Sequence, residues 1–176
     1  MKGSYAVLSG ISATAMILLA GIFCGCSALG YRLGTTLPRG ISSIHVPVMK
    51  NTSRKPRIED NATQTLISEF QRDGTLRIAD RRGADTVIET VIYDYRLEPL
   101  RYSEDRSKTT SEYRLRIKAR VVFKRTNPEQ VLRRDTVEGE SAFKPGNDLV
   151  QAERTALPEA VNDLAHNIVE FVVDYW

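Results

Sequence analysis

Alternation of side chains between residues 113 and 124 constrains the fold of this chain more than any other feature of the sequence. Every second position is apolar or aromatic: Tyr113, Leu115, Ile117, Ala119, Val121 and Phe123. The positions between them are basic with one exception: Arg114, Arg116, Lys118, Arg120, Val122 and Lys124. Because successive side chains of a β-strand point to opposite faces of the sheet, the pattern predicts a strand with one buried face and one basic face.

Four further β-rich segments and two helices are predicted around this strand. The segments 41–49, 75–79, 86–97 and 131–143 are rich in β-branched and apolar residues, and polar turns separate them. Apolar residues at every fourth position from Ile58 to Phe70, with Gly74 just beyond, predict the first helix. The second helix is predicted to start at Asn147 or Asp148, and Pro158 is expected to kink or split it near residues 154–157.

The order of these elements, β-α-β-β-β-β-α, predicts an α+β fold. We expect a two-layer sandwich in which a four- to five-stranded mixed sheet carries both helices on one face. The length suits a single domain with its own core, predicted over residues 41–176. The second face of the sheet is then left for solvent or for a partner.

The first 25 residues have the composition of a secretory signal peptide. Lys2 is followed by an apolar stretch that ends at Phe23 and contains no acidic residue. Serine, threonine and glycine interrupt this stretch, so its dense part is shorter than the roughly 18 to 20 apolar residues that span a bilayer. We therefore predict cleavage after residue 25, and the alternative is a retained membrane-anchor helix.

The only two cysteines of the chain, Cys24 and Cys26, stand at the end of this segment. Residues 23–26, Phe-Cys-Gly-Cys, are similar to a bacterial lipoprotein signal, in which a cysteine that follows a small residue is acylated. Gly25 favours Cys26 as the lipidated residue, with palmitate as an expected acyl chain and residues 26–40 as a tether. The alternative is a plain secreted protein with a spare thiol.

Short stretches spread over almost the whole mature sequence match those of a known family. They are Gly30 to Leu33, Ile44 to Thr52, Glu69 to Gly74 running into Asp80-Arg81, Ala84-Asp85, Tyr93 to Arg96, and Glu112 to Leu115. In this order and spacing after a lipoprotein signal, they resemble the LptE family of lipopolysaccharide-assembly lipoproteins. The resemblance implies a lipoprotein at the periplasmic face of the outer membrane of Gram-negative bacteria. It also implies that the protein plugs and supports the β-barrel LptD and contacts lipopolysaccharide during its delivery to the outer leaflet.

Two groups of basic residues are candidates for binding lipopolysaccharide or a partner. The first is the strand row Arg114, Arg116, Lys118 and Arg120, which could face lipid A phosphates or an acidic protein surface. The alternative is a solvated face on which Glu138 and Glu140 pair with Arg116 and Lys118 across a hairpin that turns at Asn127-Pro128. The second group lies in a predicted polar hairpin loop and comprises Arg101, Arg106 and Lys108, for which a plain solvated loop is the alternative.

Catalysis finds little support in the sequence. The two histidines, His45 and His166, are far apart in the chain, and the sequence contains no nucleophile motif or phosphate-binding glycine loop. We expect no enzyme activity, cofactor, metal site or nucleic-acid partner. The rival hypotheses are a pilotin-type lipoprotein of another envelope assembly and, with less support, a periplasmic enzyme.

Overall fold

A computed structural model describes residues 37, 38, 40–102 and 110–173, which belong to one compact unit, Thr35–Trp176. In chain order its elements are β1 (Ser43–His45), β2 (Lys50–Asn51), α2 (Ile58–Asp73), β3 (Arg77–Ile78), β4 (Thr86–Tyr102), β5 (Thr110–Arg125), β6 (Gln130–Phe143) and α3 (Leu149–Val173). Neither helix of this described part is long and apolar enough to cross a membrane.

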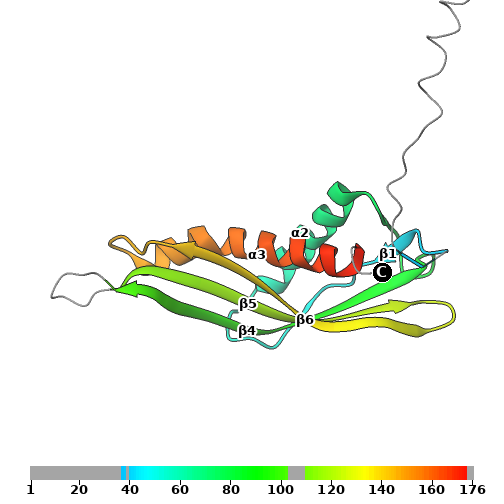
Figure 1. Cartoon of the computed structure of the whole chain (residues 1–176), viewed down its shortest axis with the longest axis horizontal. Helices are drawn as coiled ribbons and strands as arrows, with labels where there is room; N and C mark the ends of the chain where they lie inside the picture. The colour runs from blue at the N-terminus through cyan, green and yellow to red at the C-terminus, as the bar shows by residue number, and fades with distance from the viewer. Residues whose placement is uncertain (1–36, 39, 103–109, 174–176) are drawn as a thin grey trace, which may run out of the picture. The chain divides into compact units, whose positions relative to one another are not determined.

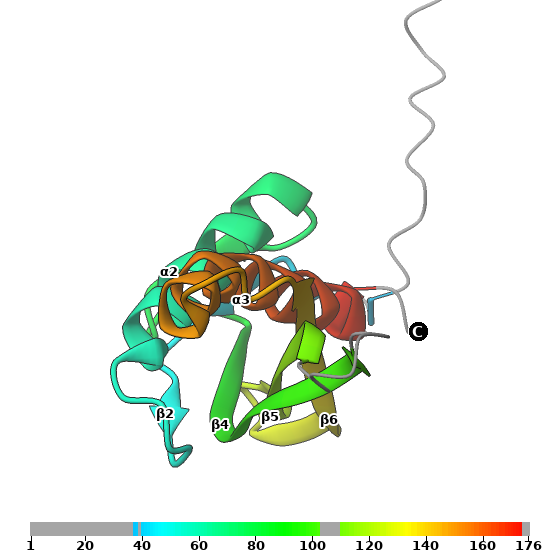
Figure 2. The same cartoon turned by 90° about the vertical axis from the view of Figure 1, so that its left-hand side faces the viewer.

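The strands form one mixed sheet in the order β3-β1-β4-β5-β6, and β2 adds to β4. The short strands β1 and β2 run parallel to β4, whereas β4, β5 and β6 form a long antiparallel meander. Both helices lie on the same side of the sheet (Figures 1 and 2). The α+β prediction, with a mixed sheet and both helices on one face, is therefore confirmed.

The alternation on β5 separates the two faces of the sheet as predicted. The apolar residues Leu115, Ile117, Ala119, Val121 and Phe123 are fully buried beneath the helices. Their basic neighbours point to the opposite side, because strand side chains alternate between faces. This opposite side is called the open face below, since neither helix covers it (Figure 2).

Helix α3 packs closely against β6, the edge strand of the sheet. A Cβ atom added to Gly139 would lie 2.4 Å from the backbone nitrogen of Leu164, so only glycine permits this approach. The Glu140 N–H donates a hydrogen bond to Asp163 (2.8 Å), and Asn167 donates one to the Glu138 carbonyl (2.9 Å). These contacts cover part of the β6 edge, which protects it from pairing with another chain.

Several element boundaries differ from the prediction. The segment 41–49 forms only the short strand β1, and β2 follows it, because Pro47 lacks the N–H that a paired strand donates. Strand β4 continues to Tyr102 rather than ending at Leu97. The prediction that Pro158 splits the second helix is wrong, since α3 is continuous through this residue. Proline leaves the backbone carbonyl one turn earlier without its hydrogen bond, and at the exposed position of Pro158 water can supply it.

The ends of the helices follow the sequence signals. Helix α2 ends at Gly74, which adopts a left-handed conformation (φ 75°) and donates its N–H to the Phe70 carbonyl. Asp148 accepts a hydrogen bond from the Gln151 N–H at the start of α3, so it is the cap that the sequence predicted as one of two candidates.

Candidate functional site

The predicted basic row lies along the middle of the open face, because β5 is flanked by β4 and β6. The residues opposite Arg114 are Glu98 and Ala142, those opposite Arg116 are Arg96 and Glu140, and those opposite Lys118 are Asp94 and Glu138. The side chains of Arg114, Arg116 and Lys118 are only partly exposed, at 34%, 24% and 27%. Neighbouring strands therefore contact most of this row.

Three carboxylates pair with the first three cations of the row. Arg114 Nε lies 3.2 Å from Glu140, and Arg116 Nη1 lies 3.2 Å from Glu98. Lys118 Nζ forms an ion pair with Glu138. The guanidinium of Arg116 also lies 3.6 Å from Glu138 and 3.7 Å from Glu140, so this arginine sits among all three acids.

The hairpin register predicted for Glu138 and Glu140 matches this arrangement, but sequence reasoning missed Glu98. The predicted strand ended at Leu97, which left Glu98 in a loop without a register. In the structure β4 continues past this point and places Glu98 opposite Arg114, within reach of Arg116. The alternation of apolar and polar residues continues through Leu97 and Glu98, and this signal could have identified Glu98 as part of the strand.

Arg120, the fourth cation of the row, is exposed and has a different environment. Its guanidinium carbon lies 5.0 Å from the centre of the Tyr93 ring, a cation–π distance. Within the described part of the chain it forms no ion pair with a carboxylate. Arg120 therefore keeps a charge that can attract an anion.

Of the other predicted candidates, only Arg101 belongs to the described part of the chain. Arg101 is part of β4, where it stands opposite Glu112. Arg106, Lys108 and Cys26 lie outside the described residues.

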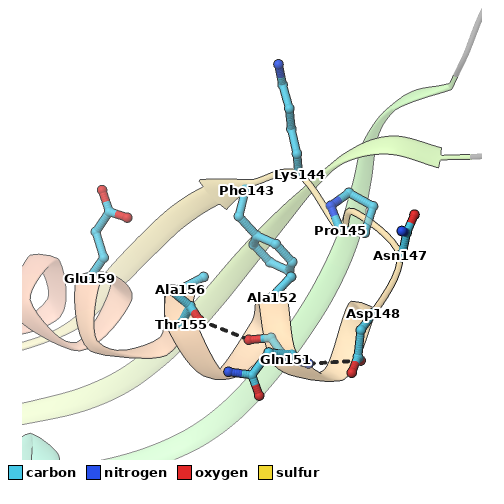
Figure 3. A pocket seen from close by; sticks show the side chains of 10 residues that line it. All are labelled: Phe143, Lys144, Pro145, Asn147, Asp148, Gln151, Ala152, Thr155, Ala156 and Glu159. Carbon is cyan, nitrogen blue, oxygen red and sulfur yellow. Dashed lines mark hydrogen bonds between the residues drawn. The ribbon is translucent and has the colours of Figure 1, made fainter.

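A shallow hollow of about 510 Å³ lies where β6 turns into α3 (Figure 3). Phe143, Ala152 and Ala156 give it an apolar floor, and Phe143 stacks on Tyr113 with 6.1 Å between ring centres. Lys144 projects from the turn above them (Figure 3). Sequence reasoning missed Lys144, because a single lysine before Pro145-Gly146 has the composition of any polar turn.

The two histidines make separate contacts. His45 Nδ1 lies 3.2 Å from the Ala79 carbonyl oxygen. His166 joins the helices, since its Nδ1 lies 3.1 Å from Glu69 on α2 and its Nε2 lies 3.3 Å from Glu170. The hydrogen bond with Glu69 raises the pKa of His166 above its usual value. In the part of the chain that the structure describes, no three histidine, cysteine or acidic side chains are grouped to hold a metal ion.

Two further polar contacts hold the domain together. Asp85 Oδ2 accepts hydrogen bonds from the backbone and side chains of Ser42 and Ser43 at 2.8 to 3.0 Å, and these bonds lower the pKa of Asp85. Glu153 on α3 accepts hydrogen bonds from Tyr95 and Lys55, both at 2.6 Å. Burial and this carboxylate raise the pKa of Tyr95. Both contacts join separate elements, so we interpret them as structural.

Comparison with known families decides what this fold represents. The model of the LptE family, described as lipopolysaccharide-assembly, matches residues 41–171. The chain belongs to the LptE family. The predicted resemblance is therefore confirmed over almost the whole of the described domain.

Solved structures share the fold of this LptE family member at low sequence identity. A minor lipoprotein from Acinetobacter baumannii is similar over 77% of this chain and 92% of its own, with 16% identity and a TM-score of 0.51. A hypothetical protein from Chlamydia trachomatis is similar over 75% of this chain and 95% of its own, with 8% identity and a TM-score of 0.53. Among curated protein sequences, none matches the chain.

Proposed function

We propose that this member of the LptE family is a lipoprotein of the outer-membrane lipopolysaccharide translocon. It is anchored at the periplasmic face of the outer membrane, and it plugs and supports an LptD-like β-barrel. It contacts lipopolysaccharide during delivery to the outer leaflet, and its role is to bind rather than to catalyse a reaction. The observation that carries the proposal is the match of a lipopolysaccharide-assembly family to residues 41–171.

The open face of the sheet supports the proposed contact with a barrel. It presents a lattice of paired charges along three antiparallel strands, and both helices pack on the other side. A surface of this kind suits contact with a polar surface of the barrel, because interfacial charges add specificity without requiring a large apolar area.

The far end of the β4–β5 hairpin supports the proposed contact with lipopolysaccharide. Arg101 lies near this end of β4, and residues Arg106 and Lys108 follow it in sequence. In the hollow beside Lys144, the apolar floor can contact a hydrocarbon chain and the lysine can contact an anion. Lipid A combines acyl chains with phosphates, so these residues match both parts of its chemistry.

The anchor is proposed at Cys26 on the basis of the sequence. Acyl chains contribute about 0.8 kcal/mol per buried methylene, so a multiply acylated terminus holds a protein on a membrane without a spanning helix. Residues 26–40 then connect the acylated cysteine to the domain.

Purification of the affinity-tagged full chain from native membranes tests the proposal. After growth with a clickable palmitate analogue, we expect a labelled protein that brings an LptD-like barrel with it. Cys26→Ser should lose the label, and the matched control Cys24→Ser should keep it. Recovery of another envelope assembly in place of the barrel would support the pilotin-type alternative and contradict the proposal.

A further inference from the structure

One part of the open face comprises residues 114–124 of β5 and the parts of β4 and β6 that flank them. The ion pairs among the charges in this part can be assigned one by one. The cations are Arg96, Arg114, Arg116, Lys118, Arg120, Lys124 and Arg134. Besides the three pairs described above, Arg96 Nε lies 2.9 Å from Asp94, and Lys124 Nζ lies 2.8 Å from Glu89. Each carboxylate on this part of the face thus has a cation of its own.

Two cations of this surface remain after the pairing. Neither Arg120 nor Arg134 forms an ion pair with any carboxylate among the residues that the structure describes. Both side chains are exposed. The excess positive charge of this part of the open face is therefore concentrated at these two positions, and the first three residues of the predicted row contribute little to it.

The strand register places Arg120 and Arg134 next to each other. Arg120 on β5 stands opposite Thr136 on β6, and the next open-face residue of β5, Val122, stands opposite Arg134. The two arginines are therefore diagonal neighbours, for which Cα atoms are about 7 to 8 Å apart. Thr136 is exposed on the same face beside them, so its hydroxyl is available as a further donor.

Tyr93 fixes the position of Arg120 without neutralising it. The ring lies 5.0 Å from the guanidinium, and a cation–π contact attracts the cation but supplies no negative charge. The two acids of β4 that flank Arg120 in the register, Glu89 and Asp94, are already paired with Lys124 and Arg96. Two guanidinium groups at neighbouring positions of one face carry several N–H donors, and such donors match the oxygens of a phosphate group.

We propose that Arg120, Arg134 and Thr136 form a binding site for a phosphate group on the open face. The inference rests on the proposed function in one respect, namely that the phosphate of a lipid A molecule is the expected occupant. The sequence pointed to Arg120 as one of four equivalent cations. The structure separates it from the other three and assigns Arg134 as its partner.

Binding to the full-length protein in detergent tests this site. The probes are lipid A with both phosphates, the same lipid A after dephosphorylation, phosphatidylglycerol and inorganic phosphate. We expect phosphorylated lipid A to bind more tightly than its dephosphorylated form. Arg120→Gln and Arg134→Gln should each weaken this binding by about tenfold, because each removes charge-assisted hydrogen bonds to the phosphate.

The matched control is Arg96→Gln, which removes an exposed arginine of the same face that already pairs with Asp94. This variant should bind phosphorylated lipid A like the wild type. Thermal unfolding of all three variants, together with the NMR shifts of arginine Nε–H groups on addition of phosphate, separates loss of the site from loss of the fold. Folded Arg120→Gln and Arg134→Gln variants that bind as the wild type does would overturn the proposal.

The remaining outcomes separate this site from the proposed function. Equal binding of phosphatidylglycerol would support the phosphate site and assign it to phospholipid headgroups. Phosphate binding that depends on both arginines, in a protein that does not co-purify with a barrel, would leave the site standing and contradict the proposed function. Arg120→Gln and Arg134→Gln variants that no longer co-purify with the barrel but bind phosphate like the wild type would show that the two arginines contact an acidic partner protein. This result would overturn the proposed phosphate site.

Discussion

At the scale of single residues, His166 makes the contact between the two helices dependent on pH. The protonated ring bonds Glu69 and Glu170 at the same time, whereas a neutral ring can donate only one hydrogen bond. Its pKa is raised above 6.5 in the folded protein. The stabilisation is therefore complete below pH 6.5 and is lost as the pH rises through the higher, folded-state value.

We predict that the wild type loses a small part of its stability between pH 5.5 and pH 8.5 through this residue. Because the His166 side chain is 55% exposed, solvent limits the effect to about 0.2 to 1 kcal/mol. Denaturant unfolding at both pH values measures it. His166→Gln should reduce the difference, and the control His45→Gln should leave it in place. An unchanged pH dependence in His166→Gln would show that the ring does not join the helices.

At the scale of the elements, the close approach of α3 to β6 depends on Gly139. A Cβ atom at this position would lie 2.5 Å from the Ala160 carbonyl oxygen as well as 2.4 Å from the Leu164 nitrogen. Both atoms belong to the helix backbone, so the side chains alone cannot relieve the clash. Helix α3 would have to move away from the sheet, which would also strain the hydrogen bonds that Asp163 and Asn167 make with β6.

Gly139→Ala should therefore destabilise the domain by about 1 to 3 kcal/mol, the usual range for overpacking of a core. The measurement is the free energy of unfolding from denaturant titration. Gly83→Ala is the control, because an added Cβ meets nothing within 4 Å there and its φ is not positive. Equal stability of the two variants would mean that α3 does not lie against Gly139.

The sequence predicted the elements well where a pattern repeats within one strand or helix. Alternation identified both faces of β5, and the four-residue repeat with Gly74 identified α2. It predicted less where a contact depends on three strands at once. Glu98 and Arg134 acquire their roles only when β4 and β6 flank β5 in a particular register, and neither strand contains that information by itself. The same holds for Gly139, where glycine is required because Ala160 and Leu164 of α3 lie against it.

At the scale of the whole molecule, the open face is a charge lattice that stabilises the meander, and it is also the surface proposed above for a partner. The double reversal Arg116→Glu with Lys118→Glu places two new carboxylates among Glu98, Glu138 and Glu140. Each cross-strand pair stabilises by about 0.2 to 1 kcal/mol, and like charges in these positions repel. We therefore predict a lower melting temperature for the double variant.

Changing Glu138 and Glu140 to lysine in the same protein should restore part of the melting temperature, because residues 116 and 118 pair with residues 138 and 140 again with reversed signs, whereas Arg114 and Glu98 then face like charges. Thermal unfolding of the wild type, the double variant and the fourfold variant measures this. A double variant that melts like the wild type but binds lipopolysaccharide or the barrel more weakly would assign Arg116 and Lys118 to ligand contact instead.

The proposed function requires this lipoprotein for the delivery of lipopolysaccharide to the outer leaflet. It is tested most directly by measuring the fraction of total lipopolysaccharide at the surface of cells from which the protein has been depleted. We expect this fraction to fall while synthesis continues, and the full-length wild-type chain to restore it. A surface fraction that stays the same after complete depletion would contradict the proposed function.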